Sequence, residues 1–268
     1  MTYVPYLFST AEMRTEQIQA LKAALAKPSL EDGEIRVPAG IAEADAALQG
    51  GLLKGALHEV FASAGHEAAA TGFAAGLAAR VAKGKPVLWI RQDFAGLEFG
   101  EIAATGLLEL GIDPSKFLVL RVAHAEDALR AASYALTCSA LGAVVIEVMG
   151  EHKVLDLKAS RRLTLGAAET KVTALLLRFG AMPDASSAET RWQIRAACSN
   201  DQDENWGMPR FAAELLRNRH GRTGHWVMEW NCDEANFREP ADRGAVVSAP
   251  FDRPAAAAME GERRRAFA

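Results

Sequence analysis

Four short runs of apolar residues, separated by stretches long enough for helices, constrain the fold of this chain most. The runs are VLWI (87–90), FLVL (117–120), AVVIEV (143–148) and TALLLRF (173–179). Continuous apolar runs of this length are typical of strands that are buried on both faces of a sheet. The intervening sequence predicts helices at about 70–83, 98–110, 125–139 and 154–170. This alternation indicates an α/β fold with a mostly parallel sheet covered by helices.

The pattern changes after the fourth run. Three further segments read as strands with no long helix between them, at 190–197, 211–217 and 225–231. We expect them to extend the sheet as antiparallel hairpins, with a polar loop at 199–209.

The two ends of the chain differ in composition from the middle. Ser9 and Glu12 fit a capping box that starts a helix, and Pro28 stops that helix. From Pro240 the chain is rich in alanine, proline and charge, which is typical of a flexible tail. The expected organisation is an N-terminal helix and linker (1–37), a core (38–239) and a C-terminal tail (240–268).

Composition narrows the class of protein. Half of the 268 residues are hydrophobic and the net charge is −4, so a large core is expected and bulk attraction to nucleic acid is not. The three cysteines, Cys138, Cys198 and Cys232, show no disulfide or metal spacing. No signal peptide and no apolar run of about 18–20 residues is visible. We therefore expect a cytoplasmic protein that does not contact membranes.

Residues 40–62 are the most informative stretch. A helix bearing Ile41 and Leu48 runs into Gly50-Gly51, and after Gly55 an apolar strand ends at Phe61. Two glycines can adopt the positive φ of a tight exit from a helix. The arrangement resembles the start of RecA-superfamily cores, and the resemblance implies a RecA-like three-layer sandwich. The plainer alternative is a generic helix–turn–strand unit that is unrelated to this superfamily.

In that family the first strand leads into GxxxxGK[ST], whose amides, lysine and hydroxyl hold phosphates and Mg²⁺. If Gly72 takes the place of the second glycine, Phe73 replaces the lysine and Ala74 the Ser/Thr, while Glu67 stands at the first glycine. Without that charge and that metal ligand, we expect no tight binding of ATP–Mg²⁺ and no ATPase activity. No cofactor is expected.

Two acidic residues fall near further positions of the family's nucleotide site. Glu147 sits where RecA-like folds place the acid that closes the second nucleotide motif. Asp93 follows VLWIRQ, near the place of the carboxylate that activates water. Carboxylates are common at the carboxyl ends of parallel strands in any α/β fold. We interpret both as remnants of an ancestral site.

A basic segment lies between the last two predicted strands. Arg217, Arg219 and Arg222 cluster with His220 and His225. Related cores end a late strand with a similar Lys/Arg-Asn-Arg turn, which in active relatives reaches the nucleotide of a neighbouring subunit. Guanidinium groups also bind DNA phosphates or carboxylates of a partner. The alternative is a hydrated hairpin tip with no ligand.

Two catalytic motifs are absent. His58-Glu59 and His66-Glu67 suggest HExxH, but positions 62 and 70 are alanine, so the zinc motif is incomplete. No GxSxG occurs, so no nucleophile elbow is expected. We predict no catalytic residue and no metal ligand.

Three motifs together resemble one narrower family, the ImuA proteins, over roughly residues 12–238. They are GGLLKGALHEV without a phosphate loop, SSAETRWQI (186–194) and LLRNRHGRTGHWVMEW (215–230). The resemblance implies a RecA-like accessory protein of SOS mutagenesis. It implies an inactive Y-family polymerase homologue (ImuB) as partner, an error-prone C-family polymerase as an indirect one, and RecA as a further candidate.

Direct DNA binding is expected to be weak or absent. RecA proper holds single-stranded DNA with two flexible loops. Here one predicted helix fills most of the first loop's place, and the second shrinks to 182–188.

Other functions remain open at this point. They are a DNA-stimulated ATPase with an irregular nucleotide site, an SOS-induced cell-division inhibitor and an inactive paralogue that caps RecA filaments. The candidate contacts to a partner are the hairpin arginines together with Arg263, Arg264 and Arg265 of the tail.

Overall fold

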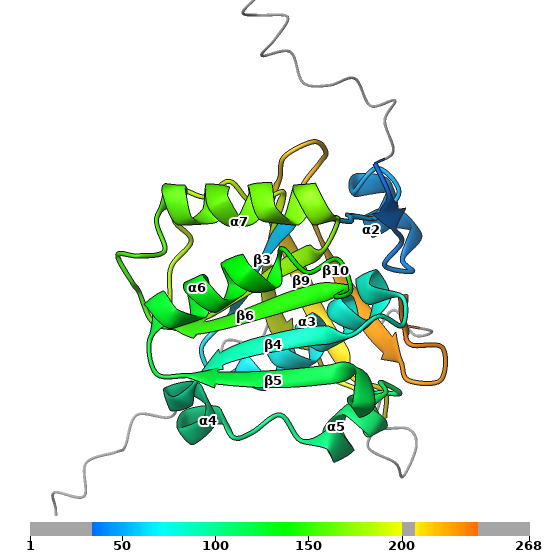
Figure 1. The fold of residues 1–268 in the computed structure, drawn as a ribbon. Helices are drawn as coiled ribbons and strands as arrows, with labels where there is room; N and C mark the ends of the chain where they lie inside the picture. Colours follow the sequence, from blue (N-terminus) through cyan, green and yellow to red (C-terminus); the bar gives the residue numbers. More distant parts are fainter. Residues whose placement is uncertain (1–33, 200–206, 241–268) are drawn as a thin grey trace, which may run out of the picture.

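The computed structural model describes residues 34–199 and 207–240 (Figure 1). The predicted N-terminal helix, most of the 199–209 loop and the tail with Arg263, Arg264 and Arg265 lie outside the described residues. What remains is built around a nine-stranded sheet in the order β11-β10-β9-β8-β3-β7-β6-β4-β5.

The strands of this sheet coincide with the predicted runs. They are β3 (Leu57–Ala62), β4 (Val87–Gln92), β5 (Phe117–Val122), β6 (Ala143–Met149), β7 (Thr173–Phe179), β8 (Thr190–Ala196), β9 (Arg210–Asn218), β10 (Gly224–Asn231) and β11 (Asn236–Arg238). The last of these, three residues long, is too short to have been recognised from the sequence.

The sheet has a parallel and an antiparallel part that meet at β8. Strands β3 to β7 pair in parallel, and β8 joins them by pairing in parallel with β3. On its other side β8 pairs antiparallel with β9, and β10 and β11 continue in the antiparallel sense. The segment 190–197 thus pairs antiparallel with β9 as expected, and its parallel pairing with β3 was not predicted.

Helices cover the parallel part on both sides, which gives three layers (Figure 1). Helices α6 (Ala125–Ala135) and α7 (Leu157–Thr170) lie on one face, and α3 (Glu67–Ala82) lies on the other. A RecA-like sandwich is confirmed in its layers and in its mostly parallel sheet. Among the described residues, no helix combines the length and the apolar character that crossing a membrane requires.

Each face of the sheet has its own hydrophobic core. Val60, Trp89 and Val145 face α3, while Leu57, Ile90 and Ile146 face α6 and α7. Because successive side chains on a strand point to opposite faces, a strand buried on both sides is apolar at most of its positions. This explains why the runs in β4, β6 and β7 are continuous.

Two expectations were wrong in detail. Strand β5 lies at an edge, and Leu118, Val119 and Leu120 are exposed, so it is not buried on both faces. The helix expected at 98–110 is two short helices, α4 (Asp93–Phe99) and α5 (Ala104–Glu109). Gly100, with a φ of +80°, separates them because a helix cannot continue through that conformation.

A small second sheet precedes the main one. Strand β1 (Arg36–Val37) pairs antiparallel with β2 (Leu52–Leu53), and α2 (Ala42–Ala47) lies between them in the chain. Gly51 has a φ of +125°, and a Cβ there would lie 2.3 Å from the Val37 carbonyl oxygen. Gly51 is thus favoured both by backbone conformation and by the approach of β1, whereas Gly50, with a φ of +106°, is favoured by backbone conformation alone.

Candidate functional site: the nucleotide position and the basic hairpin

The turn between β3 and α3 is where a phosphate-binding loop would lie. It consists of Ser63, Ala64, Gly65 and His66, because β3 ends at Ala62 and α3 begins at Glu67. The amide of Ser63 donates to Ile194 O (3.2 Å), and Gln193 Nε2 donates to Ser63 Oγ (2.9 Å). A tight turn bonded to β8 is shorter than the loop that GxxxxGK[ST] forms around phosphates.

Gly72, Phe73 and Ala74 lie inside α3, past its first turn. Phe73 is 1% exposed, and its ring packs on Trp192 (5.8 Å), Phe211 (5.7 Å) and Phe237 (5.1 Å between centroids). Ala74 is fully buried. The Phe73 ring therefore joins α3 to β8, β9 and β11, and both side chains are buried away from solvent.

Glu147, on β6, is buried against two donors on the neighbouring strand β4. Trp89 Nε1 donates to one carboxylate oxygen (2.7 Å) and Arg91 Nη2 to the other (2.9 Å). Burial raises the pKa of Glu147 above its ordinary value, and the charge of Arg91 opposes this shift. Both oxygens are thus occupied by groups of the protein itself.

Asp93, at the start of α4, is tied into the same array of charges. Arg121 Nε donates to its carboxylate (2.9 Å), Arg121 Nη1 lies 3.0 Å from Glu101, and Glu101 lies 3.5 Å from Arg91 Nη1. The two acidic residues singled out from the sequence are therefore linked through alternating arginines and a glutamate. The pairing of Arg91 with Glu147 and of Arg121 with Asp93 was not visible in the sequence.

The basic hairpin is the turn between β9 and β10. The amide of Arg219 donates to Glu189 O (2.9 Å), and the side chains of Arg219 and Arg222 are exposed. Arg217 is partly buried, and its Nη1 donates to Ser186 O (2.6 Å). Of the three predicted hairpin arginines, the structure thus presents two to solvent and uses the third as a brace.

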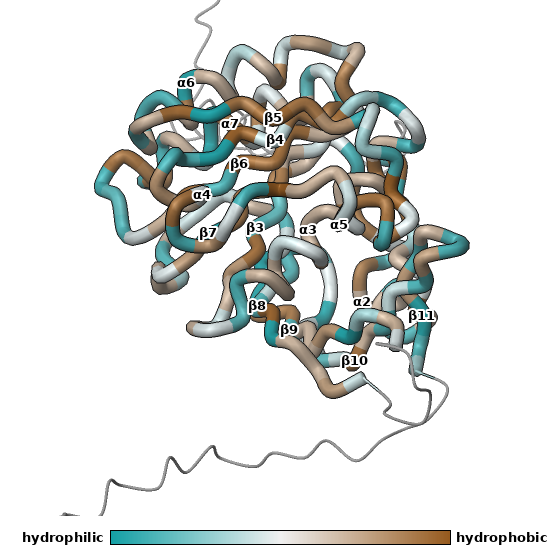
Figure 2. The backbone as a smooth tube through the Cα atoms, turned by 90° about the horizontal axis from the view of Figure 1, so that it is seen from below, coloured by the Kyte–Doolittle hydropathy of each residue, from teal (hydrophilic) through white to brown (hydrophobic). Residues whose placement is uncertain are grey.

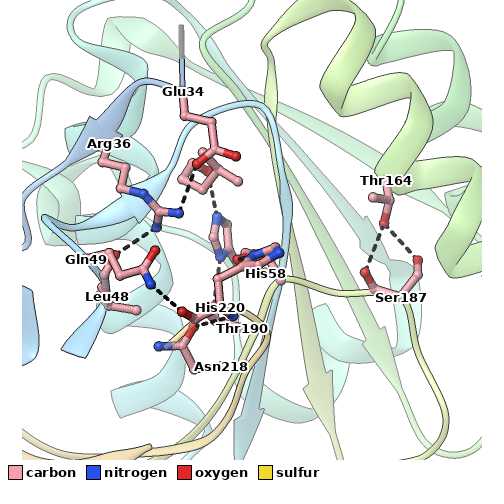
Figure 3. Close-up of polar contacts among 12 residues, drawn as sticks. Glu34, Arg36, Leu48, Gln49, His58, Thr164, Ser187, Thr190, Asn218 and His220 are labelled. Carbon is pink, nitrogen blue, oxygen red and sulfur yellow. Dashed lines mark hydrogen bonds and ion pairs between the residues drawn. The ribbon is translucent and has the colours of Figure 1, made fainter. Parts of the chain in front are cut away.

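The residues between the arginines fasten the hairpin to α2 (Figure 3). Asn218 Nδ2 donates to Ala47 O (2.8 Å) and to Arg222 O (3.1 Å), and Gln49 Nε2 donates to His220 O. A Cβ on Gly221 would lie 2.2 Å from Ala47 O, so only glycine permits this contact. The sequence signal RNRHG is therefore a docked turn that holds two guanidinium groups outward.

Beside the hairpin, His58 links β3 to β2 and β8 (Figure 3). Its Nδ1 lies 2.7 Å from Thr190 Oγ1 and its Nε2 lies 2.9 Å from Leu53 O. Because a carbonyl can only accept, the Nε2 atom carries the proton, and Nδ1 accepts from the Thr190 hydroxyl. Burial lowers the pKa of His58, which favours this neutral form. Nearby on the hairpin, His220 Nδ1 lies 2.5 Å from the Glu189 carboxylate.

The loop between β7 and β8 is fixed to its surroundings. Thr164 and Ser187 hydroxyls are 2.8 Å apart (Figure 3), and the amide of Ser187 donates to Ser160 Oγ (3.1 Å). Both partners belong to α7. The loop that shrinks to 182–188 in the sequence is thus bonded to a helix and to the Arg217 brace.

No family model matches the chain. Protein ImuA of Caulobacter vibrioides, from strain NA1000 / CB15N, is 30% identical over 233 residues, which cover 80% of this chain and 89% of that protein. Protein ImuA of strain ATCC 19089 of the same species matches to the same extent. This identity, over most of both chains, shows that the chain belongs to the ImuA family.

Proposed function

We propose that this chain is a non-catalytic, RecA-like accessory protein of DNA-damage-induced (SOS) mutagenesis. It would act as an adaptor in the cytoplasm, holding an error-prone translesion polymerase complex through protein–protein contacts. The observation that carries the proposal is a contrast within one fold. The carboxylates of Glu147 and Asp93 are bonded to arginines of the same chain. Arg219 and Arg222, in contrast, are held toward solvent on a docked hairpin.

The proposed direct partner is the inactive Y-family polymerase homologue ImuB, with the C-family polymerase bound through it and RecA as a further partner. Exposed guanidinium groups on a fixed turn suit carboxylates of a protein partner, because a preorganised donor loses little freedom on binding. Direct binding of DNA would be weak, since the chain is acidic overall and the 182–188 loop is bonded to α7.

Charge reversal of the hairpin tests this interface. The double variant Arg219→Glu/Arg222→Glu should bind the purified ImuB partner at least about tenfold more weakly, a loss of about 1.4 kcal/mol. The matched control is Arg161→Glu/Arg162→Glu on α7, which changes the net charge equally at exposed arginines in another layer. Equal weakening in both variants would indicate a bulk charge effect and exclude the hairpin.

The tail is tested in the same assay. A chain that lacks residues 240–268 should lose part of its affinity if Arg263, Arg264 and Arg265 form a second contact. Unchanged binding would exclude the tail. If the full chain fails to bind ImuB at all, the adaptor proposal itself is wrong.

A further inference from the structure

Arg178, near the end of β7, is a buried arginine without an ion-pair partner. It is 7% exposed, and its Nη2 donates to Gly150 O (3.2 Å). Within residues 34–199 and 207–240, no carboxylate forms an ion pair with it, and no atom accepts a hydrogen bond from its Nε. Burial lowers the pKa of Arg178, which the charges of Glu59, Glu151 and Asp184 only partly offset. Because arginine stays protonated and a buried charge is costly unless paired, this side chain calls for an anion.

The Arg178 guanidinium is held in place by an aromatic ring. Strands β7, β3 and β8 lie side by side (Figure 2), and Phe61 on β3 is opposite Arg178 on β7. Arg178 Cζ lies 5.7 Å from the centroid of the Phe61 ring, and Arg191 Cζ on β8 lies 5.6 Å from it. A ring face attracts cations, so the guanidinium is positioned without an ion pair of its own.

Arg178 lines a small pocket at the carboxyl ends of β3 and β7. The start of α7 contributes Asp156 and Ser160, and the β7–β8 loop contributes residues 184–186. The cavity volume is about 10 Å³, which is room for roughly one water-sized group, so a nucleotide does not fit. Ligands of open α/β sheets bind outside the carboxyl ends of the strands, where this pocket lies.

The pocket lies on the other side of the sheet from the nucleotide position of the fold. Leu163 and Leu176 line it and belong to the core under α6 and α7. Phe73 of α3 belongs to the core on the opposite face. The pocket is therefore a separate site.

The acidic groups that line the pocket are already engaged. Glu59 accepts from Arg191 Nε (2.7 Å). Asp156 caps α7 by accepting from the amide of Ala159 (2.8 Å), and Asp184 accepts from the amide next to it in the chain (2.6 Å). The amino end of a helix such as α7 also favours negative charge. None of these acids neutralises Arg178 directly.

Charge and size together define the occupant. A neutral group, a water molecule included, can accept from Arg178 Nε but leaves the charge without a counter-ion. A carboxylate supplies that charge and can accept from Nε and a neighbouring Nη with its two oxygens. It is also among the smallest anionic groups that a protein or a metabolite presents.

We propose that this pocket binds a single carboxylate group, which pairs with Arg178. The carboxylate comes either from a free small ion or from an acidic side chain of a polypeptide, because the recognised chemistry is the same. The proposal does not depend on the adaptor function.

Nuclear magnetic resonance of the full chain tests the proposal through the Nε–Hε signal of Arg178. Sodium acetate should shift this signal saturably, with a Kd on the order of 1 mM, and sodium chloride at the same ionic strength should not. N-acetylglutamate N-methylamide, with a free side-chain carboxylate, should shift it as well, and the uncharged glutamine analogue should not. Tighter binding of the glutamate compound than of acetate would assign the site to a polypeptide, and equal binding to a free carboxylate.

Thermal melts provide the matched variants. Acetate should raise the Tm of the wild type relative to chloride, because a ligand that binds only the folded state stabilises it. Arg178→Met should show no such rise, and Arg162→Met, at an exposed position of α7, should respond as the wild type does. The wild-type titration remains decisive if Arg178→Met does not fold. The proposal is overturned by an Arg178 signal that neither carboxylate shifts, by an equal response to chloride or to the glutamine analogue, or by a rise in Tm that persists in Arg178→Met.

Discussion

Replacement of Glu147 tests whether its carboxylate has a structural or a catalytic role. In Glu147→Gln the Trp89 bond can persist, but Arg91, which is 3% exposed, loses its buried counter-charge and keeps only the more distant, half-exposed Glu101. Breaking one partner of a buried ion pair costs about 3–5 kcal/mol. We therefore expect urea denaturation to show a loss of that order.

The double variant Arg91→Met/Glu147→Leu should recover most of that stability, because removing both charges leaves neither one buried alone. A structural carboxylate and a catalytic one differ in what their replacement changes: the first affects stability and the second affects activity. If Glu147→Gln left stability unchanged and abolished a measurable ATPase activity, the DNA-stimulated ATPase would become the better explanation.

Phe73 gives a second test at the scale of a single residue. Its ring contacts three aromatic side chains in the core, so Phe73→Ala should lower the free energy of unfolding by about 3–5 kcal/mol. Phe94→Ala is the control, because Phe94 is half-exposed on α4. Similar losses in the two variants would contradict a core role for Phe73.

His58 should make stability depend on pH. Burial places its folded-state pKa below the ordinary value of 6.5, so the unfolded chain binds this proton more readily. Its contribution to stability is fully present above that value and decreases as the pH falls below it. Denaturation midpoints measured from neutral pH to about pH 5 should fall more steeply for the wild type than for His58→Gln. His225→Gln, at an exposed position, should retain the wild-type slope.

The basic hairpin behaves as a unit because its turn is docked. In Gly221→Ala the new Cβ would overlap Ala47 O, so the turn must lift from α2. We expect faster hydrogen exchange at residues 218–222 and weaker ImuB binding, although Arg219 and Arg222 are unchanged. Gly106→Ala is the control, because a Cβ at that position in α5 meets no atom within 4 Å. If hydrogen exchange at residues 218–222 in Gly221→Ala equals that of the wild type, the contact with α2 does not hold the turn.

The strands were predictable because their signal is local. Continuous apolar runs reveal β4, β6 and β7 without knowledge of their neighbours. The same signal misplaced β5, since an apolar run does not say whether a strand lies in the middle or at an edge. The pairs Arg36–Val37 and Leu52–Leu53 are too short for any period, so β1 and β2 were missed.

The candidate site was predictable only in part, because a local sequence signal does not reveal partners that are distant in the chain. Arg219 and Arg222 stand on a hairpin whose turn residues can be read directly. The role of Asn218 depends on Ala47, and that of Glu147 on Arg91, which are 171 and 56 positions away in the chain. Such partners follow from the strand order, which puts β4 beside β6 and the hairpin beside α2, and not from spacing in the sequence.

The molecule taken together should bind neither nucleotide nor DNA tightly. Calorimetry with ATP–Mg²⁺ should give no micromolar affinity, because the β3–α3 turn is short and the nearby acids are paired. Fluorescence anisotropy with single-stranded DNA should show weak binding with a shallow salt dependence. A steep salt slope that is lost in Arg219→Glu/Arg222→Glu would instead assign the hairpin to DNA.

The buried position of Phe73 has a consequence for the history of the fold. A lysine placed there would put a charge among Trp192, Phe211 and Phe237, so this single substitution toward the phosphate-loop motif should destabilise the fold. The turn between β3 and α3 would also have to lengthen. Under selection that acts on single steps, a phosphate loop is therefore hard to reach from this core.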